Sequence, residues 1–231
     1  MSRHQQAMQK TANESPATRP SNATAALVTL PVSSPAPASI ARASALQQIC
    51  EHFSPSAVVE NNFRMLITGC RPGDGASTIA AALALDLSQR LSLRTLLIDA
   101  NSRRPTLHKT FIRSGVETPE LILDGPMQIR STGWAWLDLA TCCFGSTEDE
   151  RREVLARCDE VSRHYAAVVV DLGVVRLDAR MLPLARESDP IFLVVRHGHT
   201  RRQELATTTA ALQAARRSVA GAILNAVKRP A

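Results

Sequence analysis

One short segment constrains the fold of this chain most strongly, because it joins an apolar run to an alanine-rich run through a glycine-rich turn. Residues 65–78 read Met-Leu-Ile-Thr-Gly-Cys-Arg-Pro-Gly-Asp-Gly-Ala-Ser-Thr. A turn of this kind presents backbone N–H groups and the start of a helix to a phosphate. The usual phosphate-binding loop has lysine after its last glycine, whereas here Gly75 is followed by Ala76. The sequence therefore predicts a phosphate cradle without its cation.

Strand-like and helix-like segments alternate around this loop. Apolar runs of strand length occur at 64–69, 95–100, 135–141, 167–172, 191–196 and 219–225. Helical patterns are found at 76–91, 104–112, 148–164, 178–186 and 200–217. Runs without alternation, such as 168–170, are typical of strands buried on both faces of a parallel sheet. We therefore predict a single α/β domain with a doubly wound, mostly parallel sheet.

The N-terminal segment has a different composition. Residues 1–38 are rich in Pro, Ser and Ala and show no helical or strand period, which predicts a disordered tail. The folded domain is placed at 39–231, with a helix over 39–52. Trp134 and Trp136 alternate as on one face of a strand, so we expect both to pack in the core or under a helix.

Charge and cysteine content indicate the cellular compartment and the class of partner. The net charge is +6, and the arginine pairs are scattered along the chain, so we do not expect nucleic acid as a partner. The five cysteines form no CxxC pair, and an odd count without a signal peptide is typical of a reducing cytoplasm. No run reaches the roughly 18 apolar residues of a membrane span. We therefore expect a cytoplasmic protein.

Two carboxylates complete a candidate site beside the loop. Gly73 and Gly75 allow backbone angles that turn N–H groups toward one anion. Asp99 and Asp171 each end a predicted buried strand, and such side chains beside a phosphate loop suit Mg²⁺ coordination and water activation. We assign catalytic roles to Asp99 and Asp171, and a Mg²⁺ site to these two residues with Ser77.

At this point the sequence resembles a known family, the MinD/ParA-type P-loop ATPases, and within it the bacterial tyrosine-kinase modules of capsule and exopolysaccharide synthesis. Residues 72–78 are similar to the family's first Walker motif, 97–111 to its second, and 169–171 to its Walker B strand. Residues 221–225 resemble a late strand whose Asn225 would lie near the base. The resemblance implies nucleotide-binding roles for Arg71, Gly73, Asp74, Gly75, Ala76, Ser77, Thr78, Arg103 and Asn225.

The departures from the family pattern bear on activity. Ala76 stands at the lysine position and Asn101 at the second strand-tip carboxylate, while Tyr165 is the single tyrosine and no tyrosine cluster follows. The family uses a helix that contains arginine and glutamate for ring assembly, and Arg42 is all that remains of this pattern here. Arg71 or Arg103 could replace the missing charge. We expect ATP or ADP with Mg²⁺ to bind weakly or not at all.

Three functions stay open at this level. The first is a degenerate kinase-like protein that regulates or scaffolds exopolysaccharide or capsule biosynthesis and export. Its implied partner is the cytoplasmic region of a membrane polysaccharide co-polymerase, which would recruit it to the inner face of the cell membrane; self-association is left open. The second is an active ATPase or tyrosine kinase that uses Arg71 or Arg103. The third is a MinD/ParA-like positioning factor.

Overall fold

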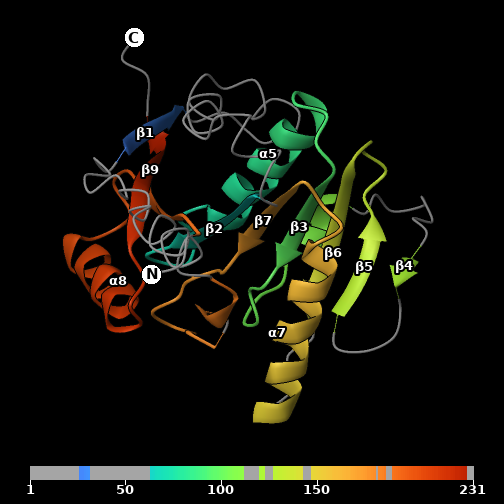
Figure 1. The fold of residues 1–231 in the computed structure, drawn as a ribbon. Coiled ribbons are helices and arrows are strands. Elements are labelled where there is room, and N and C mark those ends of the chain that lie inside the picture. Colours follow the sequence, from blue (N-terminus) through green and yellow to red (C-terminus); the bar gives the residue numbers. More distant parts are fainter. Residues whose placement is uncertain are drawn as a thin grey trace, which may run out of the picture.

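The protein forms one mixed sheet with helices on both faces (Figure 1). The structure is a computed structural model, and it describes residues 26–31, 63–111, 120–122, 127–142, 147–180, 182–185 and 189–227. The strands are β1 (Ala26–Pro31), β2 (Phe63–Gly69), β3 (Thr95–Asp99), β4 (Glu120–Ile122), β5 (Met127–Ser131), β6 (Leu137–Cys142), β7 (Ala167–Asp171), β8 (Ile191–Arg196) and β9 (Val219–Val227). The helices are α5 (Ala76–Gln89), α6 (Leu107–Phe111), α7 (Glu148–Ser162) and α8 (Arg202–Ala214), with a 3₁₀ turn η1 (Leu182–Leu184).

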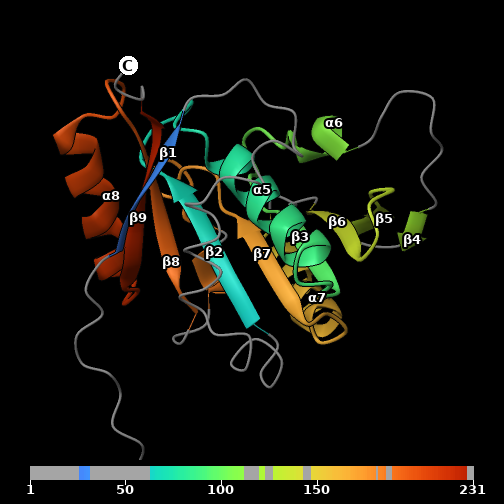
Figure 2. The ribbon, with the colours of Figure 1, turned by 90° about the horizontal axis from the view of Figure 1, so that it is seen from above.

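The order of the strands decides which segments become neighbours. Across the nine strands that the structure describes, the order is β1-β9-β8-β2-β7-β3-β6-β5-β4, and Figure 2 shows this row from above. All pairs from β1 to β6 are parallel, and only β6–β5 and β5–β4 are antiparallel among the described strands. The segments after β2, β3 and β7 therefore leave the same edge of the sheet. The predicted α/β class with a mostly parallel sheet is confirmed.

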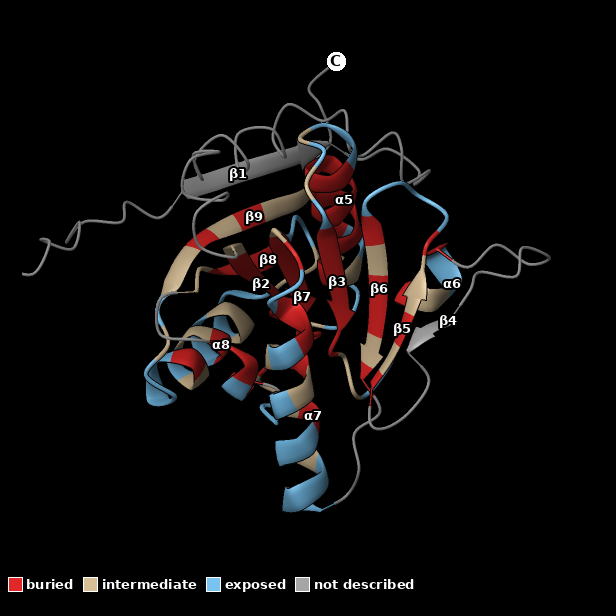
Figure 3. Ribbon diagram, turned by 45° about the vertical axis from the view of Figure 1, so that its right-hand side comes forward, coloured by how far each residue is buried: buried red, intermediate tan, exposed pale blue. Residues whose placement is uncertain are grey.

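Apolar strands build a core on each face of the sheet. All residues of β3 and β7 are buried, as expected for strands covered on both sides. One core lies between the sheet and α5 with α6, and the other lies beneath α7 and α8. Helix α5 is buried along most of its length (Figure 3). The phosphate loop therefore leads directly into a buried helix.

Some predicted elements are absent or differ. The helix predicted over 178–186 is only the short turn η1 among the described residues 178–180 and 182–185. Two local features oppose a helix there. The Asp178 carboxylate accepts a hydrogen bond from the backbone N–H of Arg180 at 3.1 Å, which bends the chain, and Pro183 lacks a backbone donor. The predicted helix over 39–52 lies outside the described residues.

The two tryptophans were also expected in the wrong place. They lie in the turn between β5 and β6, where Trp134 is 39% and Trp136 is 58% exposed. Trp136 has a φ of 64°, which breaks the alternation of a strand. The strand predicted over 135–141 therefore begins only at Leu137. The antiparallel strands β4 and β5 were not predicted.

One strand lies inside the segment predicted to be a disordered tail. β1 pairs in parallel with β9, with Ala26 opposite Gly221 and Thr29 opposite Leu224. These six residues depart from the prediction because an edge strand is held by backbone hydrogen bonds, which the surrounding Ser- and Pro-rich composition does not reveal. The rest of 1–38 lies outside the described residues.

A candidate nucleotide site at the carboxyl edge of the sheet

The loop after β2 turns through two glycines in left-handed conformations. Gly73 has a φ of 90°, and Gly75, which precedes the first residue of α5, has a φ of 95°. A Cβ at Gly75 would approach Nδ2 of Asn225 to 2.3 Å, so a side chain is excluded by space as well as by backbone angle. Both glycines are therefore required by the shape of the loop.

Side chains from β8, β9 and the loop after β8 hold three consecutive carbonyl groups of the phosphate loop. Nε2 of His199 lies 3.2 Å from the Pro72 oxygen, an Arg196 guanidinium donates to the Gly73 oxygen at 3.1 Å, and Nδ2 of Asn225 donates to the Asp74 oxygen at 2.8 Å. In a trans peptide the following N–H points the opposite way. The N–H groups of the two glycines are thus turned away from these side chains, as an anion cradle requires.

Asp74 closes the loop from inside. Its buried carboxylate accepts hydrogen bonds from the backbone N–H groups of Cys70 at 3.0 Å and Arg71 at 2.8 Å. The hydroxyl of Thr200 donates to the other carboxylate oxygen at 2.7 Å. Asp74 lines the pocket, yet these contacts give it a structural role in shaping the loop.

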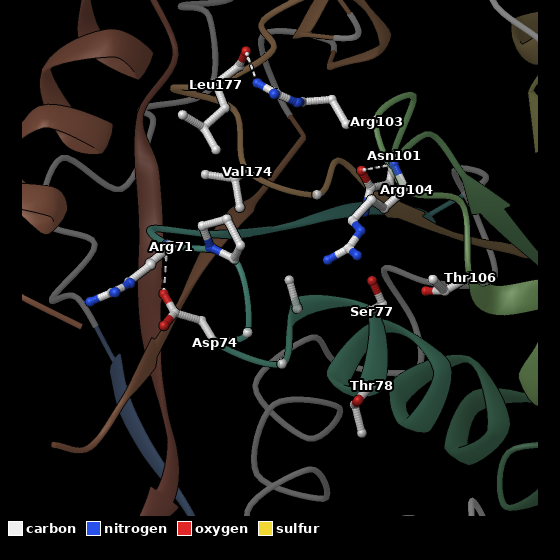
Figure 4. Close-up of a pocket in the computed structure, with 15 residues that line it drawn as sticks. Arg71, Asp74, Ser77, Thr78, Asn101, Arg103, Arg104, Thr106, Val174 and Leu177 are labelled. Atoms are coloured by element: carbon white, nitrogen blue, oxygen red, sulfur yellow. Dashed lines mark hydrogen bonds between the residues drawn. The ribbon is translucent and has the colours of Figure 1, made fainter. Parts of the chain in front are cut away.

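A cavity of about 560 Å³ opens above the loop (Figure 4). Three segments line it, one after each of β2, β3 and β7. The lining residues are Arg71, Pro72, Gly73, Asp74, Gly75, Ala76, Ser77, Thr78, Asn101, Arg103, Arg104, Thr106, Gly173, Val174 and Leu177. This includes the predicted nucleotide-binding residues except Asn225. It adds Arg104 and Thr106, which lie in the segment similar to the second Walker motif but were not singled out, and Val174 and Leu177, for which the sequence offered no motif.

Asp171 is fully buried and is not among the residues that line the cavity, and its set of hydrogen-bond partners is incomplete. Its Oδ1 accepts a hydrogen bond from the Gly173 N–H at 2.9 Å, whereas its Oδ2 has no hydrogen-bond partner within the described part of the chain. Burial raises the pKa of Asp171 to about 6, and an interaction with Ser77 partly offsets this effect. The carboxylate is therefore available to a cation.

The residues present fit a magnesium ion. The unpartnered oxygen of Asp171 and the hydroxyl of Ser77 are hard oxygen donors, and Mg²⁺ in nucleotide sites typically takes one or two protein ligands plus phosphates and water. The described residues contain no group of three or more His, Cys, Asp or Glu side chains suited to a metal. A metal here would therefore depend on the phosphates of the nucleotide.

Asp99, in contrast, has both carboxylate oxygens engaged by backbone N–H groups. Its Oδ1 accepts from the backbone N–H of Asn101 at 3.3 Å and its Oδ2 from that of Leu107 at 3.0 Å. Burial raises the pKa of Asp99, and these backbone hydrogen bonds lower it in part. Asp99 lies opposite Asp171 in the β3–β7 pair but does not line the cavity. These contacts hold the segment after β3, and the catalytic and metal roles assigned to Asp99 stay predictions.

Three arginines lie near the loop, and their guanidinium groups point in different directions (Figure 4). Arg71 donates to the His199 carbonyl at 3.3 Å and lies 3.8 Å from the Glu204 carboxylate, away from the cavity. Arg103 donates to the Leu177 carbonyl at 3.4 Å. Arg104 is exposed, and its side chain points into the cavity toward Ser77. The two arginines that the sequence suggested as substitutes for lysine are thus engaged elsewhere.

No family model matches the chain. It is 29% identical over 174 residues to the tyrosine-protein kinase YwqD of Bacillus subtilis, which is 71% of this chain and 72% of that protein. It is 27% identical over 208 residues to the tyrosine-protein kinase etk of Escherichia coli K12. The chain is a relative of the bacterial tyrosine-protein kinases. The match to the E. coli kinase covers 86% of this chain but only 28% of that protein.

Solved structures agree on the fold. The kinase domain of E. coli tyrosine kinase ETK superposes with a TM-score of 0.67 at 21% identity, over 88% of this chain and 91% of that one. A ParA family ATPase from Chlorobium tepidum has a TM-score of 0.52 at 18% identity, with 71% and 74% of the two chains covered. A plasmid partition protein from Borrelia burgdorferi, bound to AMPPNP, has a TM-score of 0.50 at 18% identity, with coverage of 73% and 76%.

The sequence matches confirm the resemblance to bacterial tyrosine-protein kinases, and the solved structures confirm that the chain shares its fold with ParA-type ATPases. Within the described residues, no helix combines the length and apolar character that crossing a bilayer requires.

Proposed function

We propose that this chain is a catalytically weak or inactive tyrosine-kinase-like P-loop protein that regulates or scaffolds exopolysaccharide or capsule biosynthesis and export. The observation that carries the proposal is a loop of intact shape, held by Arg196, His199 and Asn225, in which Ala76 occupies the lysine position. The relation to tyrosine-protein kinases supports the class of protein.

The missing lysine affects turnover more than shape. In phosphoryl transfer the enzyme contributes positioning and charge stabilisation, and the loop lysine supplies charge at the transferred phosphate. Loss of one preorganised donor costs about 10²–10³ in rate in comparable sites. Backbone N–H groups and the start of α5 still attract phosphate without it. The arrangement therefore favours occupancy of the site over catalysis.

The proposed partner is the cytoplasmic region of a membrane polysaccharide co-polymerase, and the chain would act in the cytoplasm at the inner face of the membrane. This follows from the family resemblance. The E. coli relative supports a partner of this kind in one respect. The part matched here is 28% of that longer protein, so most of that protein lies outside the kinase-like unit. Contact with the kinase-like unit would then regulate or scaffold the partner without phosphate transfer.

The alternative of an active enzyme that uses Arg71 or Arg103 has no support among the described contacts, because the two guanidinium groups already donate to the carbonyls of His199 and Leu177. The test is phosphate release from Mg-ATP by the wild-type chain and by Asp171→Ala. We expect the two rates to be indistinguishable. A clear wild-type rate that Asp171→Ala abolishes would show an active enzyme.

Nucleotide occupancy is tested by thermal shift with Mg-ADP and Mg-ATP. We expect Ala76→Lys to bind more tightly than the wild type, because the lysine adds charge at the phosphates. Gln213→Lys adds the same charge at an exposed position on α8 and serves as the matched control. Equal gains in both variants would show a non-specific charge effect.

The scaffolding role is tested in cells. A strain that lacks the gene should lose polysaccharide export, and Asp171→Ala should restore it as well as the wild type does. Restoration by the wild type alone would contradict the proposal, because export would then require an intact Mg²⁺ ligand.

A further inference from the structure

We propose that Arg104 is the cation of the phosphate site, supplied from the segment after β3 in place of the loop lysine. The ligand class is the diphosphate or triphosphate group of a nucleotide. The inference rests on the proposed function in that it presumes a nucleotide-binding loop, and it adds the residue that neutralises the phosphates.

The three candidate arginines differ in what already holds them. Arg71 bonds to a carbonyl and lies beside the Glu204 carboxylate, and Arg103 bonds to the Leu177 carbonyl. Arg104 has no side-chain hydrogen bond or ion pair with any residue in the described ranges, and Figure 4 shows its guanidinium directed into the cavity toward Ser77. Among the three, it is the arginine whose charge is not already engaged by a residue that the structure describes.

The backbone around Arg104 is held in place, so the side chain starts from a fixed position. The Arg104 N–H donates to Oδ1 of Asn101 at 3.2 Å, and the Ser102 hydroxyl bonds to the Asp178 carboxylate. Pro105 follows directly, and a residue before proline is restricted to extended conformations. A backbone that is already held in place adds little to the conformational entropy lost when the side chain binds a ligand.

Asn101 connects the two departures from the family pattern. A carboxylate at this position, beside the Arg104 backbone, would place a negative charge close to the guanidinium and compete with a phosphate for it. The neutral amide keeps the local hydrogen bond and leaves the cation free. Ala76 and Asn101 therefore act together in this proposal, since one removes a charge and the other keeps its replacement available.

A guanidinium suits this role because it binds phosphate oxygens through two parallel N–H donors. Removing a charge-assisted hydrogen bond typically weakens binding about 10- to 100-fold. The test measures binding of fluorescent Mg-ADP and of Mg-pyrophosphate to the full chain by titration. Pyrophosphate isolates the phosphate contact from contacts to the base.

We expect Arg104→Ala to weaken both ligands at least about tenfold, and Arg104→Lys to weaken them less. The competing candidates Arg71→Ala and Arg103→Ala should change affinity much less than Arg104→Ala does. Arg152→Ala, an exposed residue of α7, is the inert control. Adding Ala76→Lys to Arg104→Ala should restore binding. Thermal unfolding of each variant verifies that it is folded.

The outcomes separate this inference from the proposed function. Wild-type affinity in Arg104→Ala, or an equal loss in Arg103→Ala, overturns the role of Arg104 and leaves the proposed function standing. If the wild type binds neither ligand while Ala76→Lys binds both, Arg104 does not replace the lysine, and the inactive scaffold stands. If the wild type turns over ATP and Arg104→Ala loses binding, the inference holds and the proposed function fails.

Discussion

At the scale of single residues, the site combines a carboxylate held in an unfavourable environment with a neutral residue at the lysine position. Asp171 is fully buried, and burial is the main reason that its pKa rises to about 6 from an ordinary value of 3.8. A buried charge of this kind is costly for folding unless a cation binds it. Retention of Asp171 beside Ser77 is therefore better explained by a ligand than by stability.

The first prediction concerns Asp171→Asn. Because the folded-state pKa is raised, the folded chain keeps its proton up to about pH 6 while the unfolded chain loses it near pH 4. In the wild type, the free energy of unfolding therefore decreases as the pH rises from about 4 to 6, because the buried carboxyl group must lose its proton. At pH 7.5 we expect the asparagine variant to be more stable by about 1–3 kcal/mol.

The measurement is urea unfolding of both proteins between pH 4.5 and 7.5 without nucleotide or metal. The difference in free energy of unfolding between the variant and the wild type should become smaller as the pH falls. A constant difference across this range, or a variant less stable than the wild type at pH 7.5, would contradict the assignment. The charge of Asp99 also raises the pKa of Asp171, so the difference between the two proteins includes the loss of this interaction.

A second residue-scale prediction concerns the turn before β6. Trp136 has a φ of 64° and a mostly exposed side chain. Glycine adopts this backbone conformation without the steric cost that other residues meet, so Trp136→Gly should stabilise the protein by about 1 kcal/mol, measured by urea unfolding followed by circular dichroism. Trp134→Gly is the control, since Trp134 lacks a positive φ and should gain nothing. Equal effects in both would argue against backbone strain.

At the scale of elements, the phosphate loop depends on strands that are distant in the sequence. The carbonyls at 72–74 are held by side chains from 196–225. These segments are neighbours because β8 lies beside β2 and β9 lies next to β8. Edge strand β1 extends the same side of the sheet by pairing with β9. Stability at this edge should therefore influence the loop.

The third prediction tests β1. Proline has no N–H to donate, so a Leu27→Pro/Val28→Pro variant should lose ladder hydrogen bonds to β9. We expect faster amide exchange in peptides covering 219–227, with a tendency to self-associate because an edge is exposed. Peptides from β6, on the other side of the sheet, are the internal control. Unchanged exchange in β9 would show that β1 contributes little to this edge.

At the scale of the whole molecule, the two cores on either side of the sheet determine what is available to a partner or an enzyme. The single tyrosine of the chain, Tyr165, lies at the entrance to β7 and belongs to the second core. Its hydroxyl donates to the Asp138 carboxylate at 2.9 Å, and the Arg94 guanidinium stacks 4.9 Å from the ring centre. Burial raises the pKa of Tyr165, so it stays protonated.

The fourth prediction follows from this burial. Incubation of the folded chain with Mg-ATP should give no phosphotyrosine, because a phosphate on Tyr165 would need the hydroxyl to leave its buried hydrogen bond with Asp138. The check is an anti-phosphotyrosine blot or intact mass. A signal that Tyr165→Phe abolishes would contradict it. A denatured sample offered to an active tyrosine kinase shows whether the residue is otherwise a substrate.

The sequence by itself determined the fold class and most of the buried strands. Unbroken apolar runs such as those of β3, β7 and β8 predict a covered parallel sheet, since local hydrophobicity and burial agree there. The glycine-rich turn predicted the phosphate loop because Gly73 and Gly75 have the backbone angles that this turn requires. These features are local, and a local pattern encodes them.

Only the tertiary structure decided how charges are arranged around the loop. The sequence singled out Arg71 and Arg103 as substitutes for the lysine and did not single out Arg104, whereas contacts with His199, Leu177 and the open cavity distinguish the three. The exposed tryptophans and β1 were misjudged for the same reason, because a turn angle and an edge pairing depend on neighbouring strands. The direction of a side chain results from contacts between distant segments, and no single stretch of sequence contains them.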